Sequence, residues 1–149
     1  MGTSGREVEN KGIVNLNGQA INTRDRLLLE QTMAPNLIRH CQATPEVQVR
    51  CLDDFWNFLQ SDWATFPDAK IVPQQLVAEG DRVAVFARYE GTQLGPMGPF
   101  PPSGKRLSLD FAAFSRIEGG KIAEMWVTWD NMAALSQLGH FPPAEPPAG

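Results

Sequence analysis

The chain has few of the residues that build metal sites and disulfide frameworks. Among 149 residues there are only two cysteines, two histidines and one tyrosine. Cys41 and Cys51 form no Cys-x-x-Cys motif and have no histidine at zinc spacing. This pattern argues against a bound metal and favours buried thiols in a reducing compartment.

Long runs of one kind are also missing. No stretch of about 18 apolar residues occurs, and the first residues lack the apolar segment of a secretion signal. The 13 basic and 17 acidic residues are scattered and leave a net charge of −4. We therefore expect a soluble cytoplasmic protein that contacts neither membrane nor nucleic acid.

Proline is concentrated at one end of the chain. Four of the last nine residues are proline, and the first eight residues are small or polar. The length suits one domain with a core of its own. We expect a single domain over residues 9–140 with flexible tails at 1–8 and 141–149.

Helical periodicity dominates the first half. Residues 9–22 are weakly helical, Asp25 is placed to cap a helix over 26–33, and residues 36–42 form a short segment that carries His40 toward the interior. The clearest helix has apolar residues at steps of three and four and ends before Pro67: Leu52, Phe55, Trp56, Leu59, Trp63 and Phe66.

The second half changes to strand patterns. Residues 71–78, 82–91, 106–117 and 121–130 are rich in β-branched and aromatic residues, and a short helix follows over 131–138. The long loop 92–105 holds four prolines. This order predicts an α+β fold, in which a curved antiparallel sheet wraps around the N-terminal helices and leaves a pocket between them.

The end of the last strand carries the first candidate functional residue. Alternation puts Glu124, Trp126, Thr128 and Asp130 on one face. A carboxylate beside an aromatic wall is a candidate general base. Asp130 also stands directly before a helix, where aspartate is a preferred N-cap, and the two roles are not exclusive.

The register of the last hairpin decides what shares a face with Asp130. A two-residue turn at Gly119-Gly120 would bring Leu109, Phe111 and Ala113 to it, whereas a three-residue loop would bring Asp110, Ala112 and Phe114. We favour the three-residue loop because it turns Phe114 rather than Ser115 toward the core.

A series of short stretches, in order, resembles one family. They are Phe66-Pro67-Asp68, Val77 to Val85 (VAEGDRVAV), Gly91-Thr92, Pro101 to Arg106 (PPSGKR), Gly120-Lys121-Ile122, Glu124 with Trp126 and Asp130, and Leu135 with Gln137-Leu138-Gly139. The chain thus resembles the SnoaL-like polyketide cyclases, or ester cyclases, of the nuclear-transport-factor-two-like superfamily. The resemblance implies a cone-shaped α+β fold and a cofactor-independent aldol ring closure, with Asp130 as the acid/base residue.

The resemblance also suggests partners for Asp130, although Gln93 and Met125 replace histidines that are frequent in the family. His40 matches a frequent pocket histidine and would position a substrate carbonyl or orient Asp130; an ordinary surface or core role is the alternative. The expected substrate contacts are Trp126, Trp63, Phe114, Arg88 and Asp110. Such a residue as Trp63 is more often plain core, and an exposed ion pair is the commoner role for Arg88 with Glu90.

These inferences predict an enzyme for a hydrophobic small molecule, with the loop 92–105 over the pocket mouth and His140 in solvent. One alternative is a hydrolase like limonene-epoxide hydrolase, which would need Arg88, Glu90 or Asp110 beside Asp130. Another is a non-catalytic binder of the same fold. Because the opposite strand face carries Met125, Val127 and Trp129, we expect a homodimer or higher homo-oligomer through that face.

Overall fold

Helix α1 (Gly5–Thr23) begins at a reciprocal cap. Ser4 Oγ accepts a hydrogen bond from the Glu7 N–H, and the Glu7 carboxylate accepts one from the Ser4 N–H. This capping box satisfies two donors at the helix end, so α1 extends into the segment 1–8 that was expected to be a tail. The computed structural model describes residues 4–141, and the rest of both expected tails lies outside that range.

A strand that the sequence analysis did not predict follows the second helix. Helix α2 (Arg26–Thr32) is capped by Asp25, as expected, and leads directly into β1 (Met33–His40). Strand β1 pairs in parallel with β5 (Lys121–Trp129), and the register shifts between Met33 and Ile38. Pro35 lies in the shifted stretch, where a residue without an N–H is tolerated.

Helix α3 (Leu52–Thr65) confirms the strongest periodicity of the chain. Its apolar face is buried, and it ends just before Phe66-Pro67. Strands β2 (Lys70–Glu79), β3 (Arg82–Thr92) and β4 (Arg106–Glu118) follow in antiparallel order, and after β5 the helix α4 (Asn131–Gln137) begins.

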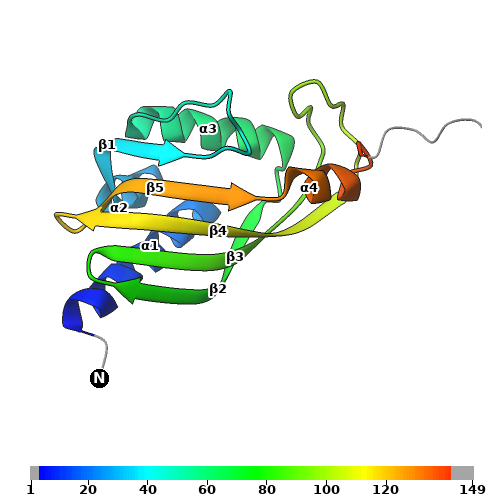
Figure 1. Ribbon diagram of the computed structural model, residues 1–149. Helices are drawn as coiled ribbons and strands as arrows, with labels where there is room; N and C mark the ends of the chain where they lie inside the picture. Colours follow the sequence, from blue (N-terminus) through cyan, green and yellow to red (C-terminus); the bar gives the residue numbers. More distant parts are fainter. Residues whose placement is uncertain (1–3, 142–149) are drawn as a thin grey trace, which may run out of the picture.

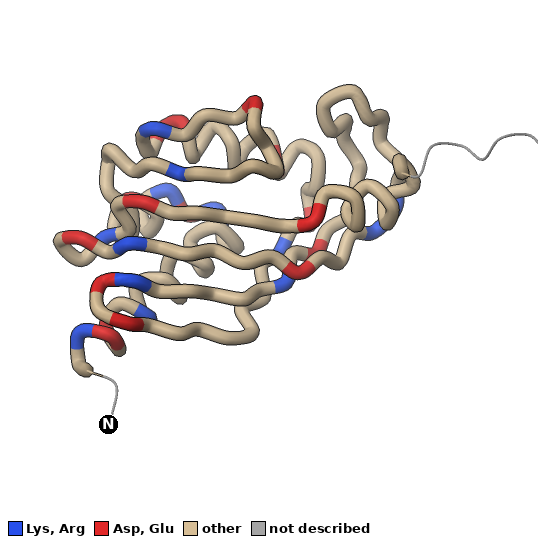
Figure 2. The backbone as a smooth tube through the Cα atoms, in the orientation of Figure 1, with Lys and Arg blue, Asp and Glu red and all other residues tan. Residues whose placement is uncertain are grey.

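The α+β fold is confirmed, with one difference in the sheet. The five strands lie in the order β1-β5-β4-β3-β2, and the β1–β5 pair makes the sheet mixed rather than wholly antiparallel. Helices α1 to α3 lie against one face of this curved sheet, which is not closed into a barrel (Figure 1). Charged residues gather near strand ends and turns, while the middles of the strands carry few (Figure 2).

The turn between β4 and β5 corrects the predicted loop. Glu118 pairs with Lys121, and both Gly119 and Gly120 have positive φ, so the turn has two residues rather than the favoured three. Ile117 then pairs with Ile122, but Arg116 pairs with Glu124. The extra residue on β5 is a bulge that reverses the face of every side chain beyond it, so Phe114 does pair with Trp126.

Candidate active site

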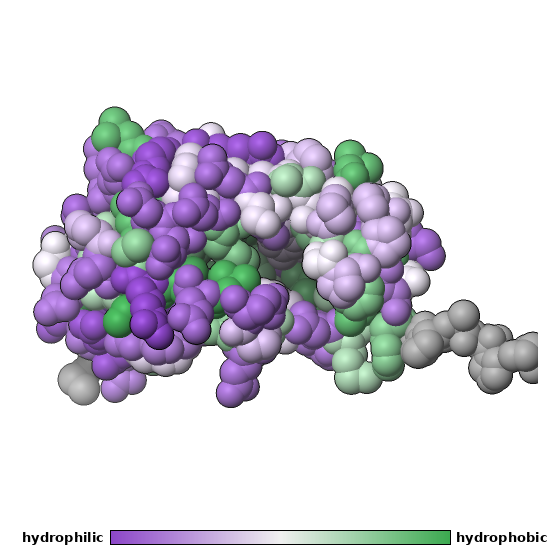
Figure 3. Space-filling model, turned by 90° about the horizontal axis from the view of Figure 1, so that it is seen from above, coloured by the Kyte–Doolittle hydropathy of each residue, from purple (hydrophilic) through white to green (hydrophobic). Residues whose placement is uncertain are grey.

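A cavity of about 440 Å³ opens between α3 and the inner face of the sheet. Its apolar walls include Phe55, Leu59, Leu109, Phe111, Met125 and Val127. Figure 3, which views the molecule from above, shows a hollow near the middle of the surface with apolar residues at its edge. The size suits a small organic ligand, and the lining suits a largely hydrophobic one.

Two polar side chains meet in the wall of this cavity. Asp62 comes from the last turns of α3 and Tyr89 from the inward face of β3. The Tyr89 hydroxyl donates a 2.6 Å hydrogen bond to Asp62 Oδ2, and the Tyr89 ring packs edge-on against Phe66. The carboxyl is therefore fixed in position inside an apolar chamber.

Burial changes the acidity of both groups. The surrounding protein raises the pKa of Asp62 to about 6, against the opposing effects of the Tyr89 hydrogen bond and the positive charge of Arg39. Burial, reinforced by the nearby Asp62 charge, also raises the pKa of Tyr89, which keeps that hydroxyl protonated and a donor. A carboxyl with a pKa near 6 can exchange protons with a substrate near neutral pH.

Arg39 is the third polar group of the cavity. Arg39 is only 8% exposed, and its guanidinium lies 4.4 Å from the centre of the Phe58 ring. Removal from water lowers the pKa of Arg39, while the Cys41 thiol and the charge of Asp62 act in the opposite direction. Arginine stays charged even so, because its ordinary pKa is so high.

The loop between β3 and β4 forms part of the cavity wall, and a buried glutamine holds it. Pro96, Met97 and Phe100 line the cavity. The fully buried Gln93 donates from Nε2 to the carbonyls of Gly95 and Pro101 at 3.2 and 3.1 Å.

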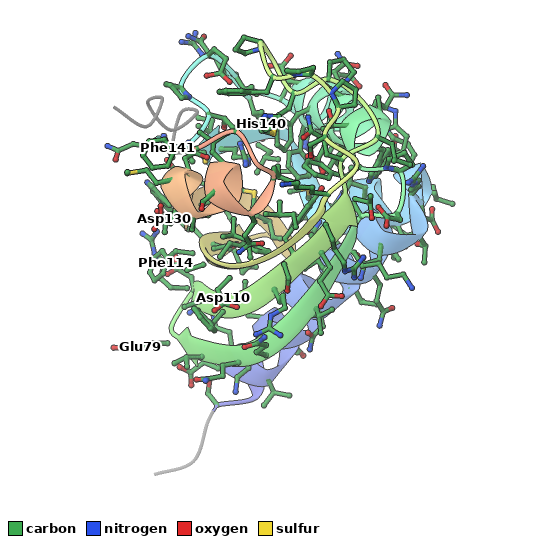
Figure 4. The ribbon with its side chains drawn as sticks, turned by 90° about the vertical axis from the view of Figure 1, so that its right-hand side faces the viewer. Glu79, Asp110, Phe114, Asp130, His140 and Phe141 are labelled. Carbon is green, nitrogen blue, oxygen red and sulfur yellow. The ribbon has the colours of Figure 1, made fainter. Side chains whose placement is uncertain are left out.

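The same glutamine also contacts His140, in the segment that follows α4. Gln93 Oε1 lies 2.7 Å from His140 Nε2, and the His140 ring packs on Phe100. His140 is therefore half-buried, and its expected place in solvent was wrong (Figure 4).

Asp130 occupies the capping position rather than the cavity. Its carboxylate accepts hydrogen bonds from the N–H groups of Met132 and Ala133 at 2.9 and 3.1 Å, and the residue is exposed. In Figure 4 it lies with Asp110 and Phe114 on the side of the sheet away from α1–α3. The prediction that Asp130 lies at the pocket base beside Trp126 was wrong.

The aromatic face that was expected inside is the outer face. Trp126 is 37% and Phe114 44% exposed, and His40 stacks on Trp126 at 5.3 Å between ring centres. His40 Nε2 also lies 2.7 Å from Glu124, so the predicted inward direction of His40 was wrong. Both faces of β5 carry apolar residues, and the helices cover the face that carries Met125 and Val127.

Met125, Val127 and Trp129 consequently line the cavity, so this face does not offer the surface through which a homo-oligomer was expected.

The remaining predicted site residues divide between the two faces. Trp63 lines the cavity. Arg88 and Asp110 pair with each other at 3.5 Å on the exposed outer face, and Glu90 pairs with Arg106 at 3.3 Å. The epoxide-hydrolase alternative requires Arg88, Glu90 or Asp110 beside Asp130 in the pocket. None of these residues lines the cavity.

Two general findings bound the chemistry of the described residues. In residues 4–141 no three histidine, cysteine, aspartate or glutamate side chains are grouped so as to hold a metal ion. None of the described helices is long and apolar enough to cross a membrane.

The polar residues of the cavity carried signals in the sequence. Asp62 stands three residues after Leu59 and seven after Phe55, on the apolar face of its helix, where a carboxylate is unusual. Tyr89, the only tyrosine, continues the inward alternation of Val83 and Ala87. Arg39 had no comparable signal, because β1 itself was not predicted.

Comparisons with known proteins agree with this architecture. The profile of the SnoaL-like polyketide cyclase family matches residues 12–138. The chain therefore belongs to the SnoaL-like polyketide cyclase family. No curated protein matches the chain significantly.

Two solved structures illustrate the likeness. IdmH of Streptomyces antibioticus, described as "a putative polyketide cyclase", is 27% identical with a TM-score of 0.77, and the match covers 87% of this chain and 98% of that one. A protein of Jannaschia sp. CCS1, described as a "putative SnoaL-like polyketide cyclase", is 25% identical with a TM-score of 0.83, and the match covers 96% and 99%.

Proposed function

We propose that this protein is a cofactor-independent enzyme that closes or isomerises a hydrophobic carbonyl compound, with Asp62 as its general base and acid. The observation that carries the proposal is the Asp62 carboxyl, whose pKa burial raises to about 6 inside an apolar cavity and whose Oδ2 accepts the Tyr89 hydroxyl. Family membership, and the description of IdmH as "a putative polyketide cyclase", support the reaction class.

The proposed reaction needs only proton transfers within the cavity. Asp62 takes a proton from a carbon between two carbonyl groups, and the resulting enolate carbon attacks a second carbonyl of the same molecule. One C–H bond breaks, one C–C bond forms, and the proton on Asp62 passes to the new alkoxide. Tyr89 holds Oδ2, which leaves Oδ1 to face the substrate.

The test compares two aspartates on a panel of aromatic β-polyketone esters. Asp62→Asn keeps the shape of the side chain but removes the base, so turnover should fall by at least about a hundredfold. The matched control is Asp130→Asn, which keeps the α4 cap and should retain wild-type turnover. In the wild type, kcat/KM should rise through a pH of about 6 as Asp62 loses its proton.

A non-catalytic binder remains the second candidate because the cavity walls are predominantly apolar. Binding of the panel compounds with no turnover by the wild type would favour it. Full turnover by Asp62→Asn would instead refute the proposed base, and loss of turnover in Asp130→Asn alone would return the role to the residue that the family resemblance suggested.

A further inference from the structure

Arg39 is a buried charge with no carboxylate in direct contact. Within residues 4–141, no carboxylate oxygen lies within 4.0 Å of its guanidinium. Five exposed or half-exposed arginines pair with carboxylates: Arg26, Arg82, Arg88, Arg106 and Arg116. Arg6, Arg24 and Arg50 do not, but they are exposed to water. Among the described residues Arg39 is the one buried arginine, and it has no such partner.

Arg39 lines the cavity, and neither of the two groups next to its guanidinium is a strong hydrogen-bond acceptor. Phe58 covers a face of the planar group, and the Cys41 thiol is a weak acceptor. An arginine fork presents several N–H donors that fit a carboxylate in two parallel hydrogen bonds. Holding this cation in an apolar chamber costs free energy, which an anionic ligand would offset.

A second polar atom in the cavity wall also lacks a partner. Thr44 follows β1 by four residues and lines the same cavity. Its Oγ1 is buried and makes no hydrogen bond with any of the described residues. A buried hydroxyl without a partner is uncommon in folded proteins and is a free donor for a ligand oxygen.

We propose that the cavity receives its hydrophobic ligand as a carboxylic acid, with the ligand carboxylate bound by Arg39 and a further ligand oxygen by Thr44. This inference rests on the proposed function, and it names the substrate class as a hydrophobic polycarbonyl acid rather than its neutral ester. A single arginine matches the single charge of a carboxylate. A phosphate dianion would place a second charge near Asp62 without a second cation to balance it.

The arrangement separates anchoring from chemistry. Arg39 comes from β1 and Asp62 from α3, and the two do not form an ion pair, although the charge of Arg39 is close enough to affect the pKa of Asp62. A carboxylate bound at Arg39 holds one end of the ligand and leaves the Asp62 carboxyl free for the reacting carbon.

A pair of probes of equal shape tests the anchor without any reaction. The probes are 2-naphthoate and the neutral 2-naphthamide, neither of which has an acidic C–H bond for Asp62 to act on. Isothermal titration calorimetry at pH 7.5 should show wild-type protein binding the acid at least about tenfold more tightly than the amide, as expected for a charge-assisted pair. Equal affinities for the two probes in the wild type would overturn the proposal, whatever the variants do.

Three variants then locate the anchor. Arg39→Gln should abolish the preference for the acid while changing amide affinity by less than about twofold, and Arg39→Lys should retain part of the preference. Thr44→Val should leave binding of 2-naphthoate unchanged, because this probe has no oxygen besides its carboxylate, but it should weaken binding of 6-hydroxy-2-naphthoate by a few-fold. Circular dichroism checks that each variant folds. The matched control is Arg88→Gln on the outer face, which should bind both probes as the wild type does.

One variant keeps the two proposals separate. Asp62→Asn should bind 2-naphthoate at least as tightly as the wild type does, because it removes a negative charge from the cavity, even though its turnover is lost. Failure of the Arg39 anchor leaves the turnover result of Asp62→Asn unchanged, and failure of Asp62 as a base leaves the probe preference unchanged. A folded Arg39→Gln that still prefers the acid contradicts the anchor alone.

Discussion

The burial that gives Asp62 a useful acidity also works against folding. Its pKa is about 6 in the folded protein and about 3.8 in the unfolded chain, so its contribution to stability is fullest below pH 4 and is lost as the pH rises through 6. Asp62→Asn removes the charge and keeps an acceptor for Tyr89. At pH 8 the free energy of unfolding of this variant should therefore be about 1–2 kcal/mol higher than that of the wild type.

Urea denaturation at several pH values measures this difference. The gain should shrink toward zero as the pH falls to 4, because the wild-type carboxyl is then protonated in both states. Asp110→Asn on the exposed outer face is the control and should show no comparable gain. A loss of stability in Asp62→Asn at pH 8 would contradict the described environment of the carboxyl.

Burial raises the pKa of Asp62, and a hydrogen bond from Tyr89 partly opposes that rise. That bond favours the charged carboxylate and lowers the pKa of Asp62, so Tyr89→Phe should raise it further. The midpoint of the pH–rate profile should move to higher pH, while the remaining ring keeps its contact with Phe66. An unchanged midpoint would show that the hydroxyl does not bind the carboxyl in solution.

At the level of elements, helix α4 depends on its cap. Asp130 accepts two N–H groups of the first turn, and asparagine caps a helix about as well as aspartate. Asp130→Asn should leave the free energy of unfolding within about 0.5 kcal/mol of the wild type, whereas Asp130→Ala should lower it by about 1 kcal/mol. Thermal or urea unfolding of both variants measures this, and equal stability of the two would argue against the cap.

The loop that lines the cavity depends on a close approach to α3. A Cβ on Gly95 would stand 2.3 Å from the Ala64 carbonyl oxygen, so the backbone has to move in Gly95→Ala. We expect the 2-naphthoate affinity of this variant to fall at least about fivefold. Gly12→Ala in α1 is the control, since nothing lies within 4 Å of its Cβ and alanine is the better helix former.

The sequence predicts where helices and strands lie better than it predicts which face of each strand is buried. The periodicity of α3 and the alternation of β2 to β5 were sufficient because each element buries one regular stripe. Strand β1 was missed because its proline and its parallel pairing with a strand 80 residues later leave no local pattern. The bulge in β5 was missed for a similar reason, because no residue type at that position indicates a bulge.

The errors in the site follow from the missing strand β1 and from the two apolar stripes of β5. Without β1, the sequence could not say that Arg39 faces inward and His40 outward. In β5 both stripes are apolar, Met125 with Val127 on one side and Trp126 on the other. The position of the helices α1 to α3 on one side of the sheet decides which stripe is buried.

At the scale of the whole molecule, the sheet presents apolar residues on both faces. The inner stripe lines the cavity. The outer face carries an aromatic patch, defined by Ile38, Phe86, Phe114 and Trp126, each between 37% and 44% exposed. Phe114 and Trp126 touch edge to face at 6.0 Å between ring centres, so the patch is contiguous at its middle. Contiguous apolar surface of this kind marks an interaction site more often than isolated exposed residues do.

A second copy of the chain is the simplest partner for this patch, because a two-fold axis would set each aromatic patch against its equivalent. We therefore predict a homodimer through the outer face.

Light scattering at micromolar concentration should give about twice the 16.4 kDa of one chain. Phe114→Arg should reduce that mass to one chain, because a charge would then be buried without a partner. Leu27→Arg is the control, since Leu27 is 65% exposed on α2 and lies outside the patch. If the wild type has the mass of one chain, or if both variants dissociate alike, the outer face is not the interface.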